Sequence, residues 1–136
     1  MRVVIDTNVL VSGIFWSGAP ARILDLWVKD SVKAIVSRPI LVEYERVIRE
    51  LSKDASPALA GQWLMFIMQH AIIVEAPVTV YKCSDPHDNK FIDCAVAGDA
   101  HFLISGDRAL LTLGKVSGTQ VVSPAQFLKH IAHKRL

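Results

Sequence analysis

The sequence has few cysteines and no long hydrophobic run. Its two cysteines, Cys83 and Cys94, do not form a C-x-x-C pair, which argues against a disulfide framework or a structural zinc site and fits a reducing cytoplasm. The most apolar stretch, residues 64–74, is interrupted by Gln69 and His70 and falls short of the roughly 18–20 residues that a membrane span needs. The chain also begins directly on a predicted strand, so we expect no signal peptide and a cytoplasmic location.

Strong charge of either sign is lacking as well, whereas apolar residues are abundant. The net charge is +2 over 136 residues, which by itself is too weak to indicate nucleic-acid binding. Hydrophobic residues make up 51% of the chain. We expect one domain over residues 1–136, because this length can bury a substantial core. The surplus of apolar residues favours a protein–protein interface, so we also expect a homodimer or a bound partner.

Short apolar segments alternate with helical patterns along the whole chain. Strands are predicted at residues 3–5, 33–36, 71–75, 101–104 and 119–122, with a further edge at 78–81 as an alternative. The first of these is a run of β-branched residues, typical of a strand that is covered on both faces of a parallel sheet. Between the second and third strands, two amphipathic patterns predict a helical hairpin. This alternation predicts a doubly wound α/β domain.

Acidic residues stand where several of these elements begin or end. Asp6 follows the first strand, Asp107 follows the strand at 101–104, and Asp88 lies in the first turn of a predicted helix. Glu43 alone would be a solvated helix carboxylate, but it joins the group if its helix leans over the same sheet edge. Chemistry in parallel sheets collects at the carboxyl ends of the strands. Several carboxylates in one cleft repel each other unless a cation neutralises them, and an all-oxygen set suits Mg²⁺ or Mn²⁺. Such a site is typical of phosphodiester hydrolysis.

These acids also have simpler interpretations. Asp6 could merely cap the helix that follows it, and we expect Asp85 to be the N-cap of the later helix. We favour Asp88 as a ligand because it shares the side of its helix that faces the sheet. Asp93 lies about 140° around that helix from Asp88. It could reach a second metal ion or simply pair with Lys90.

Four motifs resemble those of the PIN-domain ribonucleases. They are Asp-Thr-Asn-Val-Leu-Val-Ser from Asp6, Leu-Val-Glu-Tyr-Glu-Arg-Val from Leu41, Asp-Pro-His-Asp-Asn-Lys-Phe-Ile-Asp from Asp85, and Leu-Ile-Ser-Gly-Asp ending at Asp107. The sequence is similar above all to the prokaryotic branch described as toxin components of toxin–antitoxin systems. The resemblance covers nearly the whole chain and keeps the order of the motifs.

This resemblance implies a five-stranded parallel sheet flanked by helices. It also implies an Mg²⁺- or Mn²⁺-dependent endoribonuclease acting on single-stranded RNA, with an antitoxin partner and a homodimeric state. The family's acidic positions carry over onto Asp6, Glu43, Asp88 and Asp107, and its supporting polar positions onto Asn8 and Ser105. Family alignments shift the third acid along its helix, so the resemblance does not separate Asp88 from Asp93 as a ligand.

Three cations lie close in sequence to the predicted site. Arg22, Lys90 and Arg108 could hold RNA phosphates, contacts that give affinity without sequence information. Each could equally be a surface residue that serves solubility.

Other functions fit less well. A phosphotransfer receiver domain would need an aspartate after the third strand and a lysine after the last, where Glu75 and Ser123 stand. An aspartyl phosphohydrolase would need a second aspartate at the position of Asn8. A non-catalytic RNA-binding or ribosome-associated module on the same fold is the main alternative. The four acids count against it, because carboxylates without a metal ion disfavour binding of a polyanion.

Overall fold

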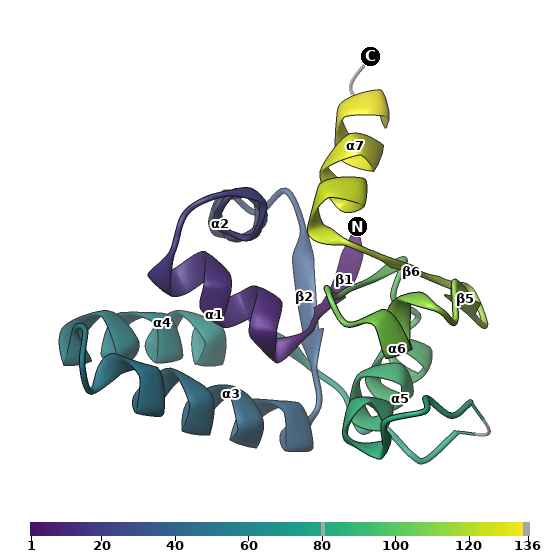
Figure 1. The fold of residues 1–136 in the computed structure, drawn as a ribbon, viewed down its shortest axis with the longest axis horizontal. Helices are drawn as coiled ribbons and strands as arrows, with labels where there is room; N and C mark the ends of the chain where they lie inside the picture. Colours follow the sequence, from purple (N-terminus) through teal and green to yellow (C-terminus); the bar gives the residue numbers. More distant parts are fainter. Residues whose placement is uncertain (80, 135–136) are drawn as a thin grey trace.

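The computed structural model describes residues 1–79 and 81–134. Its sheet has six strands in the order β3-β2-β1-β4-β6-β5, with helices on both sides (Figure 1). The strands are β1 (Arg2–Ile5), β2 (Lys33–Val36), β3 (Ile72–Ile73), β4 (Phe102–Ile104), β5 (Lys115–Val116) and β6 (Thr119–Val122). The first four and β6 run parallel, whereas β5 pairs antiparallel with β6. The predicted doubly wound α/β fold with five parallel strands is therefore confirmed, and β5 is an addition to it.

Three details of the sheet differ from the prediction. β3 is shorter than the expected 71–75, and both of its residues are exposed at the sheet edge. The alternative edge at 78–81 includes Val80, which lies outside the described residues, and the other three residues of that segment are in no strand. β5 was not expected, because a strand of two residues carries no readable periodicity.

The helices mostly carry a proline in their first turn. They are α1 (Thr7–Phe15), α2 (Ala19–Val28), α3 (Arg38–Ser52), α4 (Pro57–His70), the 3₁₀ helix η1 (Pro86–Asp88), α5 (Asn89–Ala97), α6 (Arg108–Leu111) and α7 (Pro124–Lys134). Five of the six prolines lie in the first turn of one of these helices. Proline is tolerated there because the first backbone N–H groups of a helix have no partner within it. The predicted helical hairpin is confirmed, since α3 and α4 pack against each other (Figure 1).

The order of the strands creates a crevice between β1 and β4. The chain first moves from β1 to β2 and β3, and then crosses back to β4 on the other side of β1. At such a topological switch point the carboxyl ends of two neighbouring strands are left open for a ligand. Ile5 of β1 pairs with Ile104 of β4, and the backbone N–H of Asp6 donates to the Ile104 carbonyl oxygen at 3.0 Å. The residues that follow these two strands therefore lie side by side.

The buried core holds these strand ends in place. Val3, Val4 and Ile5 of β1 are buried, as the β-branched run predicted, and α5 packs on β1, β2 and β4. From α3, the Tyr44 hydroxyl donates a hydrogen bond to the carbonyl oxygen of Ile5. This bond fixes α3 against the end of β1. Glu43, the residue before Tyr44, is thereby held close to Asp6.

Within the described residues, no single helix is long and apolar enough to cross a membrane. In the part of the chain that the structure describes, α1 and α2 taken together do reach that length and apolarity, but they are bent by 90° at their junction. Both cysteines are free and buried.

Candidate active site

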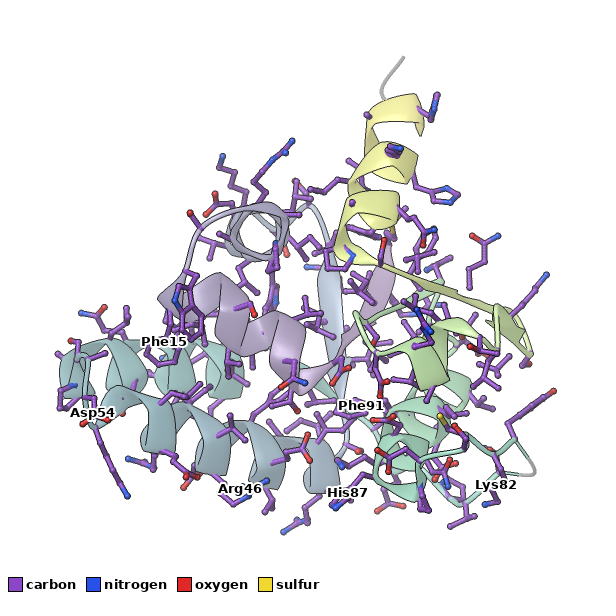
Figure 2. The ribbon with its side chains drawn as sticks, in the orientation of Figure 1. Phe15, Arg46, Asp54, Lys82, His87 and Phe91 are labelled. Carbon is purple, nitrogen blue, oxygen red and sulfur yellow. The ribbon has the colours of Figure 1, made fainter. Side chains whose placement is uncertain are left out.

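A cleft of about 250 Å³ opens at the carboxyl ends of β1 and β4. It is lined by Asp6, Thr7, Asn8, Glu43, Arg46, Val47, His87, Asp88, Lys90, Phe91 and Asp107. The walls come from the start of α1, the middle of α3, the junction of η1 with α5, and the start of α6. Figure 2 shows this arrangement, with Arg46 on α3 and with His87 and Phe91 on the side of α5. All four acids that carried over from the motifs therefore reach one cleft.

The Asp6 carboxylate is held by Ser105, the residue that follows β4. It stands at the N-cap position of α1, yet its side chain makes no capping hydrogen bond. Instead its Oδ2 accepts a hydrogen bond from the Ser105 hydroxyl at 2.6 Å, and the Ser105 oxygen accepts one from the backbone N–H of Asp107 at 2.9 Å. Burial raises the pKa of Asp6, and the Ser105 hydroxyl and the backbone N–H of Asn8 offset only part of this rise. Asp6 is therefore not merely a helix cap, because its shortest hydrogen bond comes from Ser105.

Three aspartates form the tightest acidic group of the cleft region. Carboxylate oxygens of Asp85, Asp88 and Asp107 lie within 4.8 Å of one another. Asp107 caps α6 by accepting the backbone N–H of Ala109 at 3.1 Å, and Asp85 caps η1 by accepting that of His87 at 3.0 Å. The predicted capping role of Asp85 is confirmed, but its closeness to the other acids was missed. The sequence feature that could have predicted this closeness is the spacing of three residues between Asp85 and Asp88. Side chains three residues apart lie on the same side of a 3₁₀ turn.

The carboxyl groups of Asp88 and Asp107 shift each other's pKa in opposite directions. Burial, followed by the hydrogen bond and the negative charge of Asp107, raises the pKa of Asp88 to about 7. The same hydrogen bond, together with the Ala109 N–H, lowers the pKa of Asp107. Two carboxyl groups this close cannot both ionise cheaply, so one retains a proton to near-neutral pH. A divalent cation would take the place of this proton.

Glu43 faces these aspartates from α3. Its Oε2 accepts a hydrogen bond from the Thr7 hydroxyl, and its Oε1 lies 2.8 Å from the Lys90 Nζ. Burial alone would raise the pKa of Glu43, but the hydrogen bonds from Lys90 and Thr7 outweigh it and lower the pKa. Glu43 is thus ionised, partly buried and paired with a cation.

Asp93 lies outside the cleft. Its Oδ1 accepts hydrogen bonds from the backbone N–H and the hydroxyl of Thr79, at 3.0 and 3.1 Å. It therefore ties the segment before η1 onto α5, whereas Lys90, its alternative partner, pairs with Glu43. The angle of about 140° between Asp93 and Asp88 around the helix explains why only Asp88 reaches the acidic group.

Of the three cations predicted to bind RNA phosphates, one lies in the cleft and two lie outside it. Lys90 lines the cleft, whereas Arg22 lines a different hollow between α2 and α7. Arg108 is exposed and follows Asp107 directly, without lining the cleft. Arg46, which does line it, was missed. Its signal was its position three residues after Glu43, on the same face of α3.

The sequence and the fold were compared with those of known proteins. A family model described as PIN domain matches residues 2–109. A chain of VapBC2 from Rickettsia felis, crystallised with a DNA fragment from its promoter, is similar with a TM-score of 0.59 and 14% identity. The match covers 90% of this chain and 98% of that one. PAE2754 from Pyrobaculum aerophilum is similar with a TM-score of 0.65 and 17% identity, covering 98% of this chain and 90% of that one. At these identities the two structures show the fold alone. A comparison with curated protein sequences gave no match.

Proposed function

Because the chain belongs to the PIN domain family, we propose that it is a metal-dependent endoribonuclease that hydrolyses phosphodiester bonds of single-stranded RNA. The observation that carries the proposal is the meeting of Asp6, Glu43, Asp88 and Asp107 in one cleft at the switch point of the sheet. PIN domains are nucleases in general, and the choice of RNA as substrate rests on the resemblance of the motifs.

The residues of the cleft fit a hard divalent cation. Oxygens of Asp85, Asp88 and Asp107 lie close enough together to share one ion, and Asp6 adds a further buried carboxylate beside them. The group is rich enough in negative charge that Asp88 keeps a proton to a pH of about 7. An all-oxygen set of this kind favours Mg²⁺ or Mn²⁺ over zinc or copper.

The protein side of the mechanism follows from the contacts within the cleft. A bound divalent cation supplies activation of water and stabilisation of the negative charge that develops on the phosphate oxygens. Ser105 holds the Asp6 carboxylate, and the Ala109 N–H holds that of Asp107. Asp88 would hold the ion through its ionised carboxylate, so metal binding would be linked to the loss of its proton. The cationic side chains of Arg46 and Lys90, on the walls of the cleft, are suited to bind phosphates of the RNA backbone.

We further infer that the protein is the toxin of a toxin–antitoxin pair, acting in the cytoplasm as a homodimer. The similarity of its fold to a chain of the VapBC2 complex supports this inference. So do the exposed apolar side chains of α3 and α4, which a partner protein could cover. An antitoxin partner would be supported by a small reading frame next to this gene whose protein product binds this chain.

The decisive experiment is cleavage of a mixed pool of single-stranded RNA with Mg²⁺ or Mn²⁺. We expect cleavage by the wild type, loss of cleavage with a chelator, and a fall in rate of about a hundredfold or more for Asp6→Asn and Asp107→Asn. Asp54→Asn is the matched control, because Asp54 is exposed at the turn between α3 and α4, far from the cleft (Figure 2). If the wild type binds RNA without cleaving it, the non-catalytic RNA-binding module is the correct function.

A further inference from the structure

Lys90 is an unusually constrained lysine inside an acidic cleft. Its side chain is only 19% exposed, and its Nζ lies 2.8 Å from Glu43 Oε1. The same Nζ donates a hydrogen bond to the backbone carbonyl oxygen of His87 at 2.7 Å and lies 5.1 Å from the centre of the Phe91 ring. Lysine is commonly a solvated surface charge. Here three contacts hold the ammonium group against the wall that α5 forms next to α3, where Figure 2 shows His87 and Phe91.

This position makes Lys90 a competitor for one of the predicted metal ligands. Both oxygens of Glu43 are engaged, Oε2 by Thr7 and Oε1 by Lys90. A divalent cation entering the cleft would meet the repulsion of the ammonium charge and would share Glu43 with it. Once the cation neutralises Glu43, the attraction that holds Lys90 in place weakens. The ammonium group then becomes available to a different anion.

We propose that Lys90 exchanges partners, holding Glu43 while the cleft is free of metal and binding a phosphate of the RNA backbone once a divalent cation occupies it. The inference rests on the proposed function and assigns Lys90 as a substrate-positioning residue of that site. Its consequence is that metal and RNA assist each other's binding, since the metal releases the lysine that the RNA uses. By linkage this coupling must be reciprocal.

The first test measures Mn²⁺ binding to the RNA-free protein by isothermal titration calorimetry. We expect Lys90→Met to bind Mn²⁺ about tenfold more tightly than the wild type, because one positive charge has left the cleft and Glu43 is free. Lys90→Arg, which keeps the charge, and Lys33→Met should bind as the wild type does. Lys33 is a suitable control because its ion pair with Asp30 is largely exposed. In a Glu43→Gln background the gain from Lys90→Met should shrink, which a double-mutant cycle measures.

The second test measures binding of a phosphorothioate single-stranded RNA by fluorescence anisotropy, with and without Mn²⁺. We expect Mn²⁺ to strengthen RNA binding more in the wild type than in Lys90→Met. A lysine that merely stabilises the fold would not produce opposite effects on metal affinity and on RNA affinity. Thermal melting confirms that each variant is folded before it is titrated.

Each outcome decides the question. If folded Lys90→Met binds Mn²⁺ as the wild type does, or more weakly, Lys90 does not compete for Glu43 and the exchange is refuted. The proposed function would then stand, since wild-type metal binding is unaffected. If the wild type itself binds no Mn²⁺, the proposed function fails and the exchange of partners fails with it.

Discussion

At the scale of single residues, the site is defined by how a few carboxylates are held. Ser105 links Asp6 to the backbone of Asp107 through two hydrogen bonds, so the carboxyl ends of β1 and β4 share one hydroxyl group. Asp88 and Asp107 interact as two carboxyl groups, and the pKa of Asp88 is raised to about 7 while that of Asp107 is lowered. The charge of this pair therefore changes with pH near neutrality.

The raised pKa of Asp88 predicts how stability depends on pH in the absence of metal. The pKa of Asp88 is about 7 in the folded protein against its ordinary value of 3.8, so the folded state binds a proton more tightly than the unfolded chain does. The free energy of unfolding should therefore be greatest at low pH with respect to this group and should decrease as the pH rises towards about 7. Melting in the presence of a chelator should show this decrease for the wild type.

The Asp88→Asn variant is the control for this pH dependence. Its amide cannot ionise but can still donate a hydrogen bond to Asp107. We expect its melting temperature to change less between about pH 4 and about pH 7 than that of the wild type. An equally steep decrease in both proteins would place the titrating group elsewhere. Saturating Mn²⁺ should reverse the trend in the wild type, because the ion binds the ionised pair.

At the scale of elements, the helices that carry the site depend on close packing. α1 begins directly after Asp6 and packs against α2, and a Cβ atom added at Gly13 of α1 would lie 2.7 Å from the Leu24 Cδ1 and 2.8 Å from the Pro20 carbonyl oxygen. The second contact is with backbone, which cannot move aside easily. At Gly61 of α4, by contrast, such a Cβ would meet no other described atom within 4 Å beyond its chain neighbours and the backbone of its own helix.

These two glycines give a matched pair of substitutions. We expect Gly13→Ala to lower the free energy of unfolding by about 1–3 kcal/mol through overpacking between α1 and α2. Gly61→Ala should raise it by up to about 1 kcal/mol, because alanine is the better helix former where space is free. Urea unfolding of both variants measures these differences. A stabilised Gly13→Ala variant would show that the two helices can separate without cost.

At the scale of the whole molecule, one surface carries exposed apolar side chains. Val42 of α3, Met68 of α4 and Ile73 of β3 line one shallow hollow and are each more than half exposed. β3 is also an edge strand of the sheet. Exposed apolar groups beside an open strand edge are typical of surfaces that another protein covers.

The homodimer remains a prediction, and this surface is where we expect it to form. Sedimentation at micromolar concentration should give the mass of a dimer for the wild type and of a monomer for Met68→Lys, because a buried lysine would lack a partner. Val28→Lys on α2 is the control, since Val28 is also exposed but lies on another helix. A monomeric wild type would contradict the prediction.

Much of the fold and part of the site could be predicted from the sequence because they depend on neighbours in the chain. The β-branched run before Asp6 specifies a buried strand, and prolines mark the starts of helices through their missing N–H. Parallel strands end at one edge of a sheet, so the positions of Asp6 and Asp107, one and three residues after two such strands, were enough to place them together. Strands of two residues, such as β3 and β5, carry too little pattern for their bounds or existence to be predicted.

Only the tertiary structure decided which side chains meet. It brought Asp85 close to Asp88 and Asp107, turned Asp93 towards Thr79, and paired Lys90 with Glu43 of a different helix. It also placed Arg22 beside α7, away from the cleft. These outcomes depend on how helices far apart in the chain pack on the sheet, and a local pattern contains no information about that packing. The sequence by itself therefore determined the elements and the acids at their ends, whereas packing determined the partners of those acids.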